Sequence, residues 1–156
     1  DNDDKARELH GTANKDDMAA AAVSAVRFLK THAESTGKVG TVGFCFGGGV
    51  VNLMAINSPD LDAAVAYYGP VPASLDKVAQ IKAPLLLHYA GNDSFVNPKV
   101  PEYEAALKAA NKRCTKFVYE GAQHAFTDDT AGPRYDKAAA ELAWTRTLAF
   151  FRENLR

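Results

Sequence analysis

Apolar residues gather in short runs along this chain, and Gly, Pro or polar residues bound each run. Such runs are typical of strands that are buried on both faces of a parallel sheet. The pattern predicts four strands, over Val39–Phe44, Leu61–Tyr68, Ala83–Ala90 and Thr115–Tyr119.

Apolar residues at helical spacing recur between these runs. The first helix is expected to begin at Asp16 or Asp17, either of which can cap it, and to end at Gly37. The residues before it, 1–15, are polar and are expected to form a loop. Further helices are predicted over Val50–Asn57, near Ser74–Gln80, over Lys99–Asn111 and from Tyr135 or Asp136 onward.

The last helix carries a predicted apolar stripe, formed by Trp144, Leu148, Phe151 and Leu155. Four strands that alternate with helices indicate an α/β fold with a parallel sheet covered on both faces. We therefore expect a three-layer α/β/α structure, with residues 1–156 as a single domain.

Composition removes several classes of function. The chain has 156 residues and a net charge of −1, which excludes a broadly basic surface for nucleic acid. No apolar run approaches the roughly 18 residues of a membrane span, and no signal-peptide pattern opens the chain, so a cytoplasmic, soluble protein is expected. The two cysteines, Cys45 and Cys114, have neither the spacing of a metal site nor the number needed for a disulfide scaffold.

Three reactive side chains follow directly on predicted strands: Cys45, Asp93 and His124. Because the carboxyl ends of parallel strands meet at one edge of a sheet, we expect the three to converge there. No metal or cofactor is expected, since the histidines lack paired spacing and the glycines do not form a phosphate-binding loop.

Cys45 is the centre of a Gly-Phe-Cys-Phe-Gly sequence that runs from a predicted strand towards a predicted helix. A nucleophile on such a tight turn needs glycines two residues to either side, because a Cβ at Gly43 or Gly47 would collide with the adjoining strand or helix. The turn places the Phe46 N–H and a helix N-terminus beside the sulfur, where both favour a thiolate and an oxyanion. The alternative is a buried, unreactive cysteine in a glycine-rich turn.

His124 is the histidine best placed to act as a base, because it lies in a loop beyond a strand. We expect His10 and His32 to be solvated and His88 to be packed inside its strand. Asp93 lies between Cys45 and His124 in the chain, which is the order nucleophile, Asp, His of α/β-hydrolases. Asp128 and Asp129 are rival partners for His124, whereas a residue such as Asp93 after Gly-Asn is otherwise a turn former.

From about residue 16 to the C-terminus the sequence resembles the dienelactone hydrolase (carboxymethylenebutenolidase) family. The motifs are GFCFGGG, PLLLHYAGND, and EGAQHAF with RYD and the Trp-bearing last helix. The resemblance implies the C-terminal portion of an α/β-hydrolase fold and a Cys45-Asp93-His124 triad that cleaves an ester or an enol-lactone. Some members bind the substrate carboxylate with an Arg four residues after the histidine. Here that residue is Asp128, and Arg134 is the candidate replacement.

The resemblance also implies strands before residue 39 that this chain lacks, together with an acidic residue near the thiol and a second oxyanion donor. We therefore expect the Val39–Phe44 strand to form an exposed apolar edge. A second copy of the chain or an N-terminal segment is expected to cover that edge. On this interpretation the chain alone is a weak hydrolase.

Two other functions compete with catalysis. One is a non-catalytic fragment whose open edge recruits a partner strand. The other is a redox sensor, in which Cys45 is oxidised. Cys114 is a poor resolving thiol for such a sensor, because it precedes a strand and is expected near the opposite edge of the sheet.

Overall fold

The computed structural model describes residues 2–156, which hold one sheet of four strands. The strands lie in chain order across the sheet, and every neighbouring pair is parallel. Their bounds are Gly40–Phe44 (β1), Ala63–Tyr67 (β2), Leu85–Asn92 (β3) and Cys114–Gln123 (β4). The four predicted strands are confirmed, with bounds that differ by a few residues.

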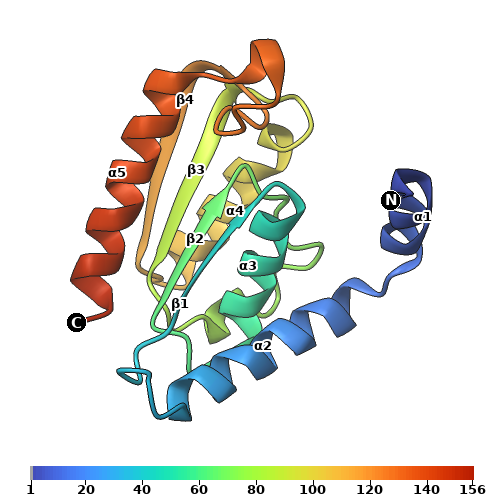
Figure 1. Cartoon of the computed structure of the whole chain (residues 1–156). Coiled ribbons are helices and arrows are strands. Elements are labelled where there is room, and N and C mark those ends of the chain that lie inside the picture. The colour runs from blue at the N-terminus through green and yellow to red at the C-terminus, as the bar shows by residue number, and fades with distance from the viewer. Residues whose placement is uncertain (1) are drawn as a thin grey trace.

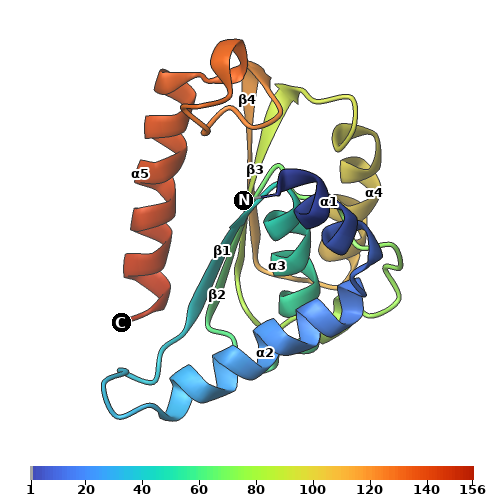
Figure 2. The same cartoon turned by 45° about the vertical axis from the view of Figure 1, so that its right-hand side comes forward.

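Helices cover both faces of the sheet (Figure 1). Seen along the sheet, α5 lies on one face, while α3 and α4 lie on the other with α2 against α3 (Figure 2). The bounds are Asp3–Thr12 (α1), Lys15–Thr31 (α2), Phe46–Asn57 (α3), Val100–Ala109 (α4) and Lys137–Asn154 (α5). The predicted three-layer α/β/α architecture is thus confirmed. Within residues 2–156 no helix is long and apolar enough to cross a membrane.

The core lies on both sides of β3, because successive side chains of a strand point to opposite faces. Leu85 and Leu87 pack with α2, α3 and α4. Leu86 and Ala90 belong to a second cluster under α5. The central strands β2 and β3 are therefore buried on both faces, as their apolar runs predicted.

β1 is an edge strand, as predicted, and it is not buried on both faces. It pairs with β2 on one side only. Val42 is 37% exposed and Phe44 is 42% exposed. The exposed apolar edge that the family resemblance implied is therefore confirmed, whereas the burial on both faces that the apolar run indicated is not found, because no described element covers the outer side of β1.

The apolar stripe of α5 is only partly buried. Trp144 and Leu148 are exposed by 47% and 37%, whereas the small residues Ala143 and Thr147 are fully buried. Small residues let the middle of the helix approach the sheet closely. Towards its end the stripe does pack, since Phe151 lies against the buried cluster and a Cβ at Gly40 would lie 2.8 Å from its ring.

Residues 3–12 form helix α1, although the polar sequence predicted a loop. Asn2 caps it by accepting a hydrogen bond from the Lys5 N–H, and none of its residues is buried. Capping and i,i+3 ion pairs such as Lys5–Glu8 stabilise it locally, and the His10 ring packs edge-on against the ring of Phe46 in α3, with centroids 4.5 Å apart. Residue 1 lies outside the described residues.

The predicted ends of other elements also shift. Asn14, and not Asp16 or Asp17, caps α2, and the helix ends at Thr31, well before Gly37. The helix predicted near Ser74–Gln80 shrinks to a single turn at Val78–Gln80. Two further short turns of 3₁₀ helix are Asn97–Lys99 and Gly132–Arg134.

β4 continues to Gln123, beyond the Tyr119 at which the predicted strand ended. The extension pairs with β3 through Asn92, beyond a shift in register. Only Ala122 of the extension is buried, because β4 is the other edge strand of the sheet and one side of it meets solvent. The longer strand places His124 directly after its last residue.

Candidate active site

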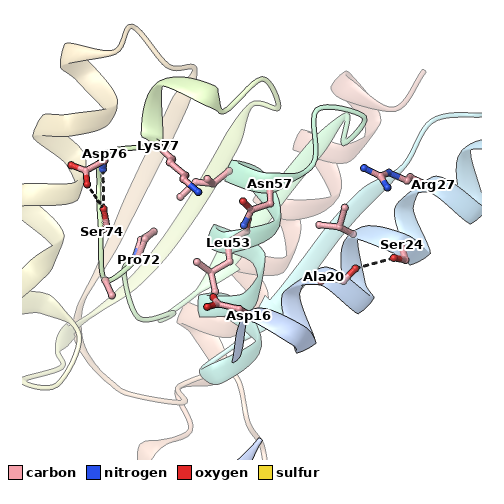
Figure 3. A pocket seen from close by; sticks show the side chains of 13 residues that line it. Asp16, Ala20, Ser24, Arg27, Leu53, Asn57, Pro72, Ser74, Asp76 and Lys77 are labelled. Carbon is pink, nitrogen blue, oxygen red and sulfur yellow. Dashed lines mark hydrogen bonds between the residues drawn. The ribbon is translucent and has the colours of Figure 1, made fainter. Parts of the chain in front are cut away.

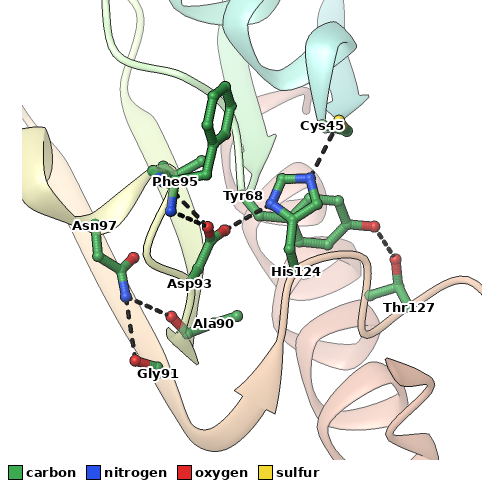
Figure 4. Close-up of polar contacts among 10 residues, drawn as sticks. Cys45, Tyr68, Ala90, Gly91, Asp93, Phe95, Asn97, His124 and Thr127 are labelled. Atoms are coloured by element: carbon green, nitrogen blue, oxygen red, sulfur yellow. Dashed lines mark hydrogen bonds and ion pairs between the residues drawn. The ribbon is translucent and has the colours of Figure 1, made fainter. Parts of the chain in front are cut away.

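The structure places one chemically distinctive side chain directly after the end of each strand. Cys45 follows β1, Tyr68 follows β2, Asp93 follows β3 and His124 follows β4. In a parallel sheet these positions share one edge. Figure 4 shows the four side chains together at this edge.

Cys45 lies on a sharp turn between β1 and α3. Its backbone has φ 52° and ψ −119°, in the left-handed half of conformational space, and α3 begins with the next residue. Its N–H donates to the Tyr67 carbonyl and its carbonyl accepts from the Gly49 N–H. Phe46 is the first residue of α3, so its N–H has no acceptor within the helix and stays available beside the sulfur.

The glycines around Cys45 differ in whether the structure has room for a side chain at their positions. A Cβ at Gly43 would lie 2.2 Å from the Gly47 carbonyl oxygen, so the prediction of a clash is confirmed there. At Gly47 a Cβ would meet nothing within 4 Å, and the prediction was wrong. The backbone of Gly47, and not its missing side chain, makes the close contact. Gly48 does need its small size, since its Cβ would lie 2.7 Å from the Tyr67 carbonyl oxygen.

The sulfur, the imidazole and the carboxylate form one chain of contacts (Figure 4). His124 Nε2 lies 3.1 Å from Cys45 Sγ, and His124 Nδ1 lies 2.6 Å from Asp93 Oδ2. The other carboxylate oxygen, Oδ1, accepts hydrogen bonds from the Phe95 and Val96 N–H groups at 3.1 and 3.0 Å. The predicted convergence of the three side chains is confirmed by these distances.

The tautomer of His124 decides the direction of each hydrogen bond. An ionised carboxylate only accepts hydrogen bonds, so in the tautomer that pairs with it Nδ1 donates to Asp93 and Nε2 faces Cys45 Sγ as an acceptor. Asp93 is buried while Cys45 is exposed, so the carboxylate is protected from water and the sulfur is open to a ligand.

The rival carboxylates do not contact His124 through any hydrogen bond in the structure. Asp128 Oδ1 accepts from the side chain and the backbone N–H of Thr130, and these bonds, with the charge of Arg134, lower the pKa of Asp128. Arg134 itself lies in the turn Gly132–Arg134, on the exposed surface. No hydrogen bond joins it to the three converging side chains, so its role stays a prediction.

The other histidines lie where the sequence indicated. His10 and His32 are exposed. His88 is fully buried, with Nδ1 2.8 Å from the Tyr119 hydroxyl and Nε2 3.1 Å from the Thr147 hydroxyl. Burial, helped by the charge of Arg146, lowers the pKa of His88 to about 3. His88 is therefore neutral and tethers α5 to the sheet.

Cys114 lies at the amino ends of the strands, opposite to Cys45 as predicted, because it begins β4 whereas Cys45 follows the carboxyl end of β1. Burial raises the pKa of the Cys114 thiol to about 11. Among residues 2–156, no group of three or more His, Cys, Asp and Glu side chains is arranged to hold a metal ion.

Tyr68 was missed in the sequence, where it was assigned to the predicted strand. Its ring centroid lies 5.0 Å from that of His124, and its hydroxyl lies 2.5 Å from Thr127 Oγ1. The available signal was its position: Tyr68 stands before Gly-Pro at the end of an apolar run, as Cys45 and Asp93 stand at the ends of theirs.

Two cavities of the chain differ in their distance from the triad edge. One of about 690 Å³ opens between α2, α3 and residues 72–77, on the sheet face opposite α5 (Figure 3). A smaller one of about 280 Å³ adjoins the site, since it is lined by Phe44, which precedes Cys45, and by Thr127. Tyr67 and Trp144 also line it, so its surface is largely aromatic.

Comparisons with known proteins agree with this geometry. A protein of Saccharolobus solfataricus named "Putative carboxymethylenebutenolidase" is 33% identical over 144 residues, which are 92% of this chain and 54% of the relative. One of Escherichia coli K12 with the same name is 36% identical and covers 71% of this chain and 44% of the relative. The chain thus spans about half the length of these relatives.

A solved structure is also similar. The "Putative Dienelactone Hydrolase" of Klebsiella pneumoniae superposes with a TM-score of 0.85 at 29% identity, over 94% of this chain and 65% of that one. The profile of the dienelactone hydrolase family matches residues 1–155. A match over nearly the whole sequence, with the fold to support it, leads to one conclusion: the chain belongs to the dienelactone hydrolase family.

Proposed function

We propose that this chain carries a Cys45-Asp93-His124 triad that hydrolyses an ester or a lactone through an acyl-thioester. The observation that supports it most is the unbroken chain of contacts from Cys45 Sγ through both imidazole nitrogens to Asp93 Oδ2, at 3.1 and 2.6 Å. Membership of the dienelactone hydrolase family supports the choice of substrate class.

Acylation is the first half of the proposed reaction. His124 Nε2 takes the thiol proton, and the Cys45 thiolate attacks the carbonyl carbon. The Phe46 N–H donates to the resulting oxyanion. The tetrahedral intermediate then expels the alkoxide, which takes the proton from Nε2, and the acyl group stays on sulfur. In a lactone the alkoxide remains part of the same molecule, so this step opens the ring.

Hydrolysis of the thioester completes the cycle. His124 Nε2 takes a proton from water, and the hydroxide attacks the acyl carbon. Collapse releases the carboxylic acid and returns the thiolate, which recovers its proton from the imidazolium. Asp93 holds the imidazole in the required tautomer through Nδ1. We retain Arg134 as the proposed partner of a substrate carboxylate.

Alkylation of the thiol tests this proposal without a known substrate. Iodoacetamide should label Cys45 well below pH 8, because a thiol paired with His124 is more thiolate-rich than a free one, which has a pKa of about 8.5. His124→Ala should lower the labelling rate at pH 7 by about 10-fold or more, since only a few per cent of an ordinary thiol is ionised there. His32→Ala, an exposed histidine outside the site, is the control. If Cys45 of the unmodified chain labels like an ordinary thiol, the catalytic proposal fails.

The length of the relatives bears on how fast the chain works. The resemblance to the family implies a second oxyanion donor outside the matched half, and loss of one such donor costs about 10²- to 10³-fold in rate. We therefore propose that this chain alone is a weak hydrolase, because the missing donor slows the formation of both tetrahedral intermediates. Hydrolysis of p-nitrophenyl acetate by this chain and by the S. solfataricus relative tests this. Equal kcat/KM values for the two would contradict it, and no acylation at all would favour the non-catalytic binding module.

A further inference from the structure

The backbone around His124 is strained at three points. Cys45, Tyr68 and Ala125 are non-glycine residues with positive φ, at 52°, 36° and 69°. Such conformations cost about 1–3 kcal/mol each and cluster where a site requires them. The proposed mechanism accounts for two of them: Cys45 is the nucleophile, and Ala125 follows the base His124 directly. Tyr68 is the one whose strain that mechanism does not explain.

Tyr68 is fixed from both sides by its backbone. Its N–H donates to the His88 carbonyl at 2.6 Å, which extends the pairing of β2 with β3. The next residue, Gly69, is pressed against α3, since a Cβ there would lie 2.4 Å from the Gly48 carbonyl carbon. The side chain is therefore held in one direction, and it is buried.

That direction leads beneath His124 and on to its loop (Figure 4). The Tyr68 ring lies 5.0 Å from the imidazole and 5.5 Å from the ring of Phe126, which is fully buried. Its hydroxyl then reaches Thr127 Oγ1 at 2.5 Å. Tyr68 thus contacts the catalytic histidine and two of the next three residues, which form the whole turn after β4.

We propose that Tyr68 is a positioning residue, which holds His124 Nε2 in line with Cys45 Sγ through its ring and through the hydrogen bond to Thr127. This inference rests on the proposed function of the triad. The ring fills the space under the imidazole, and the hydroxyl fixes the far end of the turn, so His124 cannot swing away from the sulfur. Burial raises the pKa of Tyr68, so the phenol remains a neutral hydrogen-bonding group.

Two substitutions each remove the hydrogen bond between Tyr68 and Thr127, which we call the tether, from opposite ends. Tyr68→Phe keeps the ring and deletes the hydroxyl, and Thr127→Val keeps the size and deletes the other hydroxyl. Each should lower the iodoacetamide labelling rate of Cys45 at pH 7 by about 3- to 10-fold, the usual worth of one net hydrogen bond. Each should also move the midpoint of the pH–rate profile to higher pH, because a displaced imidazole stabilises the thiolate less.

The double variant and a conservative variant separate positioning from general damage. Because both single changes break the same bond, the double variant should lose little more than either one. Thr127→Ser keeps the hydroxyl and should restore the normal rate and profile. Tyr89→Phe is the matched control: Tyr89 is equally buried, on the other face of the sheet, and its hydroxyl has no partner within residues 2–156.

The outcomes are distinct from those that test the triad. If His124→Ala lowers labelling while Tyr68→Phe and Thr127→Val leave both the rate and the pH profile unchanged, the tether has no role and only this inference is wrong. A lower melting temperature with an unchanged profile also overturns it, because the hydrogen bond then serves stability alone. If His124→Ala has no effect, the proposed function itself fails.

Discussion

The triad edge and the outer side of β1 are neighbours in this protein. The polar groups of the first have hydrogen-bond partners, whereas the apolar side chains of the second are exposed to solvent. At the triad edge both oxygens of Asp93 accept hydrogen bonds and both nitrogens of His124 face a partner. On the other side lies what we call the β1 flank: Val42 and Phe44 on β1 with Trp144 and Leu148 on α5. These four side chains are all more than one third exposed.

The difference separates two requirements of a hydrolase. In the proposed mechanism, proton transfer needs a few groups held at fixed distances, and the residues after β1, β3 and β4 supply them. A substrate site also needs walls that exclude water, whereas the apolar side chains of the β1 flank have no cover among residues 2–156. We therefore expect substitutions at the triad edge to change chemistry and those on the β1 flank to change association.

Asp93→Asn should have the largest effect on activity. The amide oxygen can still accept from Phe95 and Val96, but its NH₂ group would face His124 Nδ1. The imidazole then carries its proton on Nε2 and cannot accept one from the thiol, a change that costs about 10⁴-fold in comparable triads. Release of p-nitrophenolate from p-nitrophenyl acetate measures it. Asp128→Asn is the control, and a similar loss in that exposed variant would contradict the assignment.

Two aromatic residues provide the sharpest contrast in stability. Phe126 is fully buried under Tyr68, so Phe126→Ala should lower the free energy of unfolding by about 3–5 kcal/mol. Trp144 is larger but 47% exposed, so Trp144→Ala should cost about 1 kcal/mol or less. Urea denaturation of both variants checks the difference. Equal losses would mean that the β1 flank is as well packed in solution as the core.

Acid should weaken the attachment of α5. The pKa of His88 is about 3 in the folded protein and about 6.5 in the unfolded chain, so the unfolded chain binds more protons between these values. The free energy of unfolding must then fall as the pH decreases from 6.5 towards 3, by up to about 1.4 kcal/mol per pH unit from this residue. His88→Gln should flatten that slope, whereas His32→Gln, an exposed control, should not. Parallel slopes for His88→Gln and the unmodified protein would refute the assignment.

The sequence predicted those elements and site residues that short apolar runs mark in the chain. The apolar runs located all four strands, and the positions just past their ends located Cys45, Asp93 and His124. It could not predict α1, because that helix has no buried residue to mark it. The extension of β4 was missed for a related reason, since only Ala122 of its residues is buried and an edge strand needs apolar residues on one face only.

Other features depend on tertiary contacts that no local pattern reveals. The stripe on α5 has helical spacing, yet Ala143 and Thr147 make the contact with the sheet, because they let α5 approach it closely. Gly47 looks obligatory in the motif, although only its backbone is in close contact. The position of Tyr68 before Gly-Pro was a signal in the sequence, but its contacts with His124 and Thr127 form only in the folded chain.

Replacing one valine of an edge strand by lysine should have the smallest effect on folding of the changes considered, and it tests whether a second copy of the chain covers β1. Val42 and Val118 are similarly exposed, at 37% and 43%, on the two opposite edge strands β1 and β4. We expect the chain to self-associate through the β1 flank, because an open strand edge beside apolar side chains favours pairing with another copy. Val42→Lys should shift sedimentation towards the monomer, while Val118→Lys should not, and each should change the free energy of unfolding by only about 0.5 kcal/mol. If the unmodified chain is monomeric at every concentration, a second copy does not cover this edge, and a separate N-terminal segment becomes the better explanation.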